Sequence, residues 1–104
     1  GESSDDVRIR ITSARALQKI RFENHSRSIT TNNEMRADDV EKFIILTPTL
    51  RTLFNSSAEK LKLSPRAYHK VLKVARTIAD LGQSSEIQQA HILEALAYRP
   101  TDLR

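Results

Sequence analysis

The fold is decided by the stretch Leu63-Ser64-Pro65-Arg66-Ala67-Tyr68-His69-Lys70-Val71-Leu72-Lys73-Val74-Ala75-Arg76-Thr77-Ile78-Ala79-Asp80-Leu81. Ser64 is a good helix cap and Pro65 suits the first helical position, so a helix over 65–81 is predicted, with Gly82 placed to end it. At about 100° per residue, one face of this helix is apolar: Tyr68, Val71, Leu72, Ala75, Ile78 and Ala79. The opposite face is polar: Arg66, Lys70, Lys73, Thr77 and Asp80.

Upstream of this stretch, similar signals predict three more helices. Two serines and then two acids, at residues 3–6, open a helix that runs to about residue 23. The polar residues 24–33 are typical of a loop, and a short helix begins between residues 33 and 37. Thr47-Pro48 repeats the start signal of Ser64-Pro65 and opens the helix that carries Leu50, Phe54 and Leu61.

Downstream, residues 85–88 fit a capping box for a last helix, which starts there or a few residues later and runs to about Tyr98. Tyr68 and Tyr98 are expected in the core or at its boundary. Only two Gly and three Pro interrupt a chain rich in helix-forming residues. We therefore expect an all-α protein, a compact bundle of about five helices in a single domain over residues 1–104.

The first helix is apolar on two sides. Val7, Ile11, Ala14 and Phe22 follow one stripe, and a second stripe on nearly the opposite side holds Ile9, Ala16 and Ile20. A helix with two apolar faces usually contacts two neighbours. We expect one of these neighbours to lie outside this chain.

Composition excludes several classes of function. The chain has no Cys, so it holds no disulfide and no thiolate metal site, in keeping with a cytoplasmic location. No apolar run approaches membrane-spanning length and no signal peptide is recognisable, so no membrane partner is expected. The three His residues, at 25, 69 and 91, are too far apart for a local metal motif and are expected at the surface or boundary. We expect no metal site and no catalytic residue within the isolated domain.

Positive charge is concentrated in one segment. The net charge of the chain is +4, but residues 60–76 contain six cations and no acid. Such a segment attracts phosphate from a nucleotide or from nucleic acid, or is simply a solvated helix face. Arg76 is the exception, because it can pair with Asp80 one helical turn later and is interpreted as structural.

The same stretch, from Leu63 to Leu81, resembles the C-terminal motif of the magnesium chelatase-like AAA+ ATPases of the ComM type. The resemblance continues through Ile87, His91, residues 94–96 and Tyr98-Arg99. Upstream it includes Glu2-Ser3-Ser4, Val7-Arg8, Ala14-Arg15 and Gln18, whereas residues 24–46 match only loosely. It thus covers nearly the whole chain.

The resemblance implies a helical lid over the nucleotide site of a P-loop ATPase that forms hexameric rings. By similarity, Arg66 is the sensor-2 arginine that reaches the terminal phosphates, and Lys70 and Lys73 are accessory contacts to phosphate or to the adjacent subunit. ATP and Mg²⁺ would be bound only through the parent protein, because this chain has no glycine-rich phosphate loop. The implied partners are the protein's own P-loop core and neighbouring subunits, and DNA where the parent acts in branch migration and recombination.

The position of Arg66 in its helix agrees with that role. It lies in the first turn, where backbone N–H groups are free and the helix dipole is positive, and its rigid fork suits phosphate oxygens. Two alternatives stay open: a DNA-binding module that uses the cations of residues 60–76, and a protein-interaction domain that uses the stripe of Ile9, Ala16 and Ile20.

Overall fold

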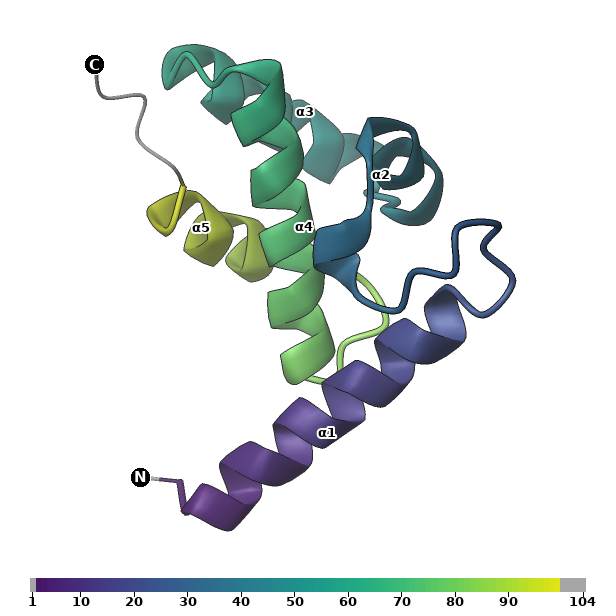
Figure 1. The fold of residues 1–104 in the computed structure, drawn as a ribbon. Helices are drawn as coiled ribbons and strands as arrows, with labels where there is room; N and C mark the ends of the chain where they lie inside the picture. Colours follow the sequence, from purple (N-terminus) through teal and green to yellow (C-terminus); the bar gives the residue numbers. More distant parts are fainter. Residues whose placement is uncertain (1, 100–104) are drawn as a thin grey trace, which may run out of the picture.

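A computed structural model describes residues 2–99 and places helix α4 (Pro65–Leu81) at the centre of the molecule (Figure 1). Four further α-helices lie around it: α1 (Ser4–Arg21), α2 (Ala37–Phe43), α3 (Pro48–Lys60) and α5 (Gln89–Ala97). A short 3-10 helix, η1 (Asn32–Glu34), precedes α2. α4 contacts α1, η1, α2 and α5. The all-α fold with five α-helices is confirmed for the described part of the chain, in which no strand occurs.

The start of α4 is built as its sequence predicts. The Ser64 hydroxyl accepts a hydrogen bond from the Ala67 N–H at 3.1 Å, and Pro65 occupies the first turn. At its other end Gly82 is the cap but has a φ of −86°, while the next residue, Gln83, takes the left-handed φ of 56°. The Ser84 N–H then bonds back to the Ala79 carbonyl at 2.8 Å, which ends the helix.

The core forms along the predicted apolar face of α4. Val71, Leu72, Ala75 and Ala79 are buried there, packed with side chains from α2, α3, α5 and the connecting segments. The largest of these are Phe22, directly after α1, Ile44, directly after α2, Phe54 and Ile92. Full burial of a side chain such as Leu72 contributes about 1.5–3 kcal/mol to folding. Burial against this one face therefore orients the helices around α4.

Of the expectations for the C-terminal region, the later start of the last helix is confirmed and the burial of Tyr98 is wrong. Residues 85–88 do not form the first turn of α5; the helix begins at Gln89, and the carbonyls of Ser84 and Ser85 before it accept hydrogen bonds from Arg76. Tyr98 is not a core residue: it follows the end of α5 and is 68% exposed. Tyr68 does lie at the core boundary, stacked near Phe54.

Only part of α1 packs on the body. Ala14, Gln18 and Phe22 are buried, but Val7 and Ile11 on the same stripe, and Leu17 beside it, are exposed by about two fifths of their area. Figure 1 shows the reason: the N-terminal half of α1 extends away from the other helices. Among the helices of residues 2–99, none has the length and apolar character needed to cross a bilayer.

Candidate functional site

Arg66 lies at the exposed amino end of α4. Its position is fixed by the capped first turn, in which Ser64 satisfies the N–H of Ala67. The Arg66 side chain is exposed to solvent. A guanidinium beside the positive end of a helix dipole is mildly disfavoured unless an anion lies between them. The geometry of this turn therefore suits an anionic ligand.

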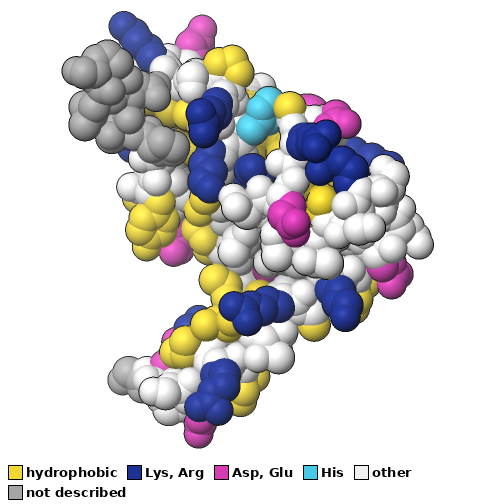
Figure 2. Space-filling view, viewed as in Figure 1, with side chains coloured by type: hydrophobic (Ala, Val, Ile, Leu, Met, Phe, Trp, Pro, Cys, Tyr) yellow, Lys and Arg dark blue, Asp and Glu magenta, His cyan; other side chains and the backbone are white. Residues whose placement is uncertain are grey.

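Lys70 and Lys73 follow Arg66 along the same face of α4, and Figure 2 shows Lys and Arg side chains gathered over this part of the molecule. The Lys70 ammonium donates to the side-chain oxygen of Asn33 at 3.0 Å. The Lys73 ammonium donates to the backbone carbonyls of Asn33 and Met35 at 3.1 and 3.2 Å. Burial, together with the nearby charges of Lys70 and Arg66, lowers the pKa of Lys73. Lys73 thus ties α4 to the segment around η1, whereas Lys70 stays exposed.

We call Arg66, Lys70 and Lys73 the basic row. Its C-terminal end borders a small cavity of about 230 Å³, lined by Lys70, Lys73, Val74, Thr77, Ile78, Asn33 and Tyr98. The row can bind an anion electrostatically, but it contains no nucleophile with an adjacent base. The sequence predicted these three cations on one face, and the structure brings them together.

The C-terminal half of the same face is closed by a buried ion-pair network. Arg21 of α1 binds the Asp80 carboxylate with both of its terminal nitrogens, at 2.8 and 2.7 Å. Asn32 donates to the same carboxylate at 2.9 Å, and Arg76 pairs with it at 3.1 Å. Burial alone would raise the pKa of Asp80, but these hydrogen bonds and charges outweigh it and hold the pKa below its usual value. The predicted pairing of Arg76 with Asp80 is confirmed, and its role is structural.

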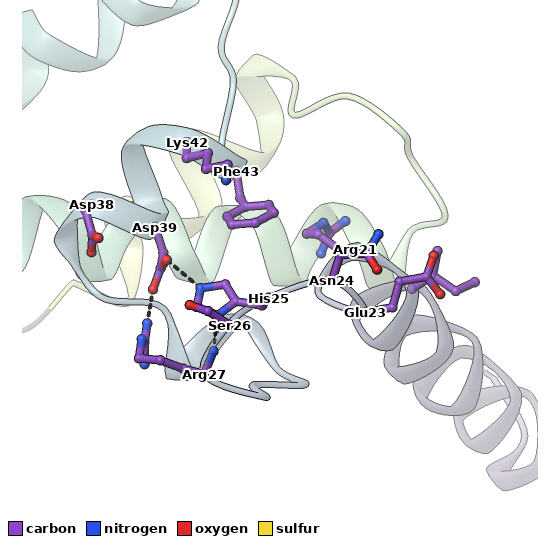
Figure 3. Close-up of a pocket in the computed structure, with 11 residues that line it drawn as sticks. Arg21, Glu23, Asn24, His25, Ser26, Arg27, Asp38, Asp39, Lys42 and Phe43 are labelled. Carbon is purple, nitrogen blue, oxygen red and sulfur yellow. Dashed lines mark hydrogen bonds and ion pairs between the residues drawn. The ribbon is translucent and has the colours of Figure 1, made fainter.

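A second polar cluster lies at a cavity of about 510 Å³ beside α2 (Figure 3). His25 donates from Nε2 to Asp39 at 2.7 Å, and its Nδ1 accepts the N–H of Arg27 at 2.9 Å. The Asp39 carboxylate also accepts from the Arg36 N–H and from the Arg27 guanidinium. Burial opposes ionisation, but the bonds from His25 and Arg36 and the Arg27 charge lower the pKa of Asp39 to about 2.

This cluster holds the loop before α2 and is not a catalytic dyad. Both ring nitrogens of His25 are engaged, so neither is available to accept a proton from a substrate. His25 lies in the loop at the boundary of the domain, as expected, and its side chain is 8% exposed. Its partner lies 14 residues later, and no spacing rule links the two.

The other two histidines lie away from this cluster. His91 caps α5 by accepting the Gln88 N–H at 2.9 Å, and His69 lies 3.6 Å from Glu41. Among residues 2–99, no three His, Cys, Asp or Glu side chains gather as a metal site would require.

Comparisons with known proteins identify the family of the chain. Residues 1–99 match the family model described as magnesium chelatase, subunit ChlI C-terminal. The chain is 36% identical over 99 residues to the competence protein ComM of Haemophilus influenzae, covering 95% of this chain and 18% of that protein. It is 35% identical over 102 residues to the uncharacterized protein YifB of Escherichia coli, and 32% identical over 102 residues to YifB of Salmonella typhimurium. Each of these two alignments covers 98% of this chain and 19% of the relative.

The chain therefore spans about a fifth of the length of these curated relatives. No solved structure matches it. Since the family model covers nearly the whole chain, the protein belongs to the ComM-like magnesium chelatase family and corresponds to its C-terminal domain.

Proposed function

We propose that this domain is the lid of an ATP-driven AAA+ ring motor, and that Arg66 senses the terminal phosphates of the nucleotide. The observation that supports the proposal most is an exposed arginine at the capped start of α4, heading a row of cations with no acid in it. Membership of the magnesium chelatase family gives this arginine a context in which phosphate is the natural ligand.

The surroundings of Arg66 favour a phosphate ligand over a carboxylate of the domain itself. The first turn of α4 contains no acid, and the next cations on the same face are Lys70 and Lys73. The arginine fork forms two parallel hydrogen bonds to phosphate oxygens, which a lysine cannot do. An anion held there would also relieve the repulsion among the three cations.

Lys70 and Lys73 are proposed as accessory contacts to phosphate or to the adjacent subunit. Lys70 suits this role better, because its Asn33 partner is a single exposed side chain. Lys73 would have to leave two backbone carbonyls.

The nucleotide itself would be bound by the parent protein. The present sequence contains no glycine-rich phosphate loop, so we propose that ATP and Mg²⁺ bind to a P-loop core elsewhere in a protein as long as the relatives. That core and the neighbouring subunits of a ring are the proposed partners. The 104-residue chain alone should neither bind ATP tightly nor hydrolyse it.

The test is Arg66→Ala in the full-length protein, with ATP turnover measured at steady state. Loss of a phosphate-contacting arginine should reduce turnover by about 100-fold or more. Arg66→Lys should recover only part of it, because the charge returns without the fork. Lys60→Ala, which removes an exposed cation at the end of α3, is the matched control and should turn over normally. Normal turnover in a folded Arg66→Ala protein would exclude the sensor role.

A second candidate function is DNA binding, with a parent that acts in branch migration and recombination. The concentration of cations in residues 60–76 favours it, although Arg76 is buried in ion pairs and does not contribute. We expect a salt-dependent shift of duplex or branched DNA, weakened by Lys70→Glu and Lys73→Glu. No shift at low salt would count against it.

A further inference from the structure

The outer side of α1 is apolar and has no cover within the described residues. Ile9 and Ile20 are 60% and 63% exposed. Ala16 lies between them, and spacings of seven and four residues keep all three on one side of the helix. This side faces away from the buried residues Ala14 and Gln18. The apolar side chains on this side of α1 therefore do not stabilise the domain itself.

A groove continues this surface towards the body. Its volume is about 400 Å³, and it lies between α1 and the turn that follows α4. Ser13, Ala16, Leu17, Ile20 and Arg21 line the α1 side, and Arg76, Asp80, Gln83, Ser84 and Ser85 line the other. Because Ser13 and Ala16 are small, the groove has room for an apolar side chain from a partner. We call Ile9, Ser13, Ala16, Leu17 and Ile20 the outer face of α1.

We infer that the outer face of α1 and this groove bind the polypeptide that precedes Glu2 in the full-length protein. The inference rests on the proposed function, in which this domain is one part of a longer ATPase. About four fifths of the length of each relative lies outside the match, and the matched family model is the C-terminal one. The bulk of such a protein therefore joins this domain at the tip of α1, which Figure 1 marks as N.

This point of attachment favours the preceding polypeptide over a second copy of the domain. A segment tethered a few residues from Val7 meets α1 at a high effective concentration, whereas a second copy must associate from solution.

The charges of α1 add a further requirement for the docking segment. Residues 7–22 contain cations and no acid. Arg8, Arg10 and Arg21 have carboxylate partners within the domain. Arg15 and Lys19 are exposed. The docking segment should therefore be apolar at its centre and acidic at its edge.

The test is amide hydrogen exchange of α1, compared between the full-length protein and the 104-residue chain, which has its own core. We expect residues 9–20 to exchange at least about tenfold more slowly in the full-length protein, since docking closes the helix to solvent. Ile9→Asp and Ile20→Asp should each restore fast exchange there. Leu93→Asp, on α5 and similarly exposed at 51%, is the matched control and should leave α1 protected.

Two results would overturn the inference. One is equal exchange of α1 at both chain lengths. The other is protection that appears in the 104-residue chain as its concentration rises and disappears with Ile20→Asp, which would assign the surface to a second copy. Neither depends on ATP turnover, because Arg66→Ala should reduce turnover and leave α1 protected. Failure of the sensor role and failure of the docking surface are thus distinguishable.

Discussion

Asp80 shows how much of this domain depends on a single buried carboxylate. It is fully buried, and it joins three segments: Arg21 at the end of α1, Asn32 at the start of η1 and Arg76 within α4. Arg76 extends the network by donating to the carbonyls of Ser84 and Ser85. Removal of one partner from such a buried set leaves the other charges without compensation.

We therefore predict that Asp80→Asn destabilises the domain by about 3 kcal/mol, since two arginines would stay buried without a counter-charge. Urea unfolding followed by circular dichroism measures the effect. Asp5→Asn is the control: it removes an equally close pair with Arg8 that is exposed, and should cost less than about 0.5 kcal/mol. Equal losses in the two variants would contradict the structural role of Asp80.

At the residue scale, what could be predicted from the sequence depended on distance along the chain. Ser64 as a cap and the Arg76–Asp80 pair follow from local helix geometry, and both are confirmed. The bond from Arg21 to Asp80 joins residues 59 positions apart, and His25 meets Asp39 across a polar loop. Such pairs depend on how the helices pack against one another, and local periodicity in the sequence does not predict that packing.

At the scale of the elements, α3 and α4 end in the same way. Each is followed by a residue in the left-handed region, Lys62 with φ 56° after α3 and Gln83 with φ 56° after α4. In each case the next N–H bonds back into the last turn, from Leu63 to the Ala58 carbonyl and from Ser84 to the Ala79 carbonyl. The sequence predicted a glycine stop for α4, but the residue with positive φ is the one after Gly82.

We predict that Lys62→Gly and Gln83→Gly each stabilise the domain by roughly 0.5–1 kcal/mol, because glycine adopts positive φ without strain. Gly82→Ala should also be neutral or stabilising, since its φ is −86° and an added Cβ would meet nothing closer than 3.6 Å. Urea midpoints of the three variants decide this. Destabilisation by Gln83→Gly would contradict the geometry at the end of α4.

The hydrogen bonds of Asp39 with His25, Arg27 and Arg36, here called the clamp, should make the attachment of α2 depend on pH. The pKa of Asp39 is about 2 in the folded protein, against 3.8 for an Asp without partners, as in the unfolded chain. The unfolded chain therefore takes up the proton first as pH falls. The stability that Asp39 contributes is therefore complete above about pH 4 and is lost as pH falls through about 2. Asp39→Asn should lower stability at pH 6 and flatten this part of the acid profile, measured by urea unfolding at several pH values. An unchanged profile would show that the clamp contributes nothing to folding.

At the scale of the whole molecule, α4 organises the fold and α1 is only half attached to it. The sequence predicted five helices because capping residues and 3.6-residue periodicity are local signals. It also indicated that α1 has two apolar stripes, but not where along the helix the body ends. That boundary depends on the position of η1 and of the turn after α4, and the structure places the first buried residue of α1 at Ala14.

Removal of residues 1–10 should consequently change stability by only about 1 kcal/mol, the worth of a lost helix cap, because none of residues 2–10 belongs to the core. Phe22→Ala, at the attached end of the same helix, should cost about 3–5 kcal/mol. Urea unfolding of the two variants compares the ends of α1 directly. If the truncation proved as costly as the Phe22 change, Val7 and Ile9 would be supporting the domain itself. A small loss would show that Val7 and Ile9 do not support the fold of the domain, which leaves Ile9 free for the docking of the preceding polypeptide on α1.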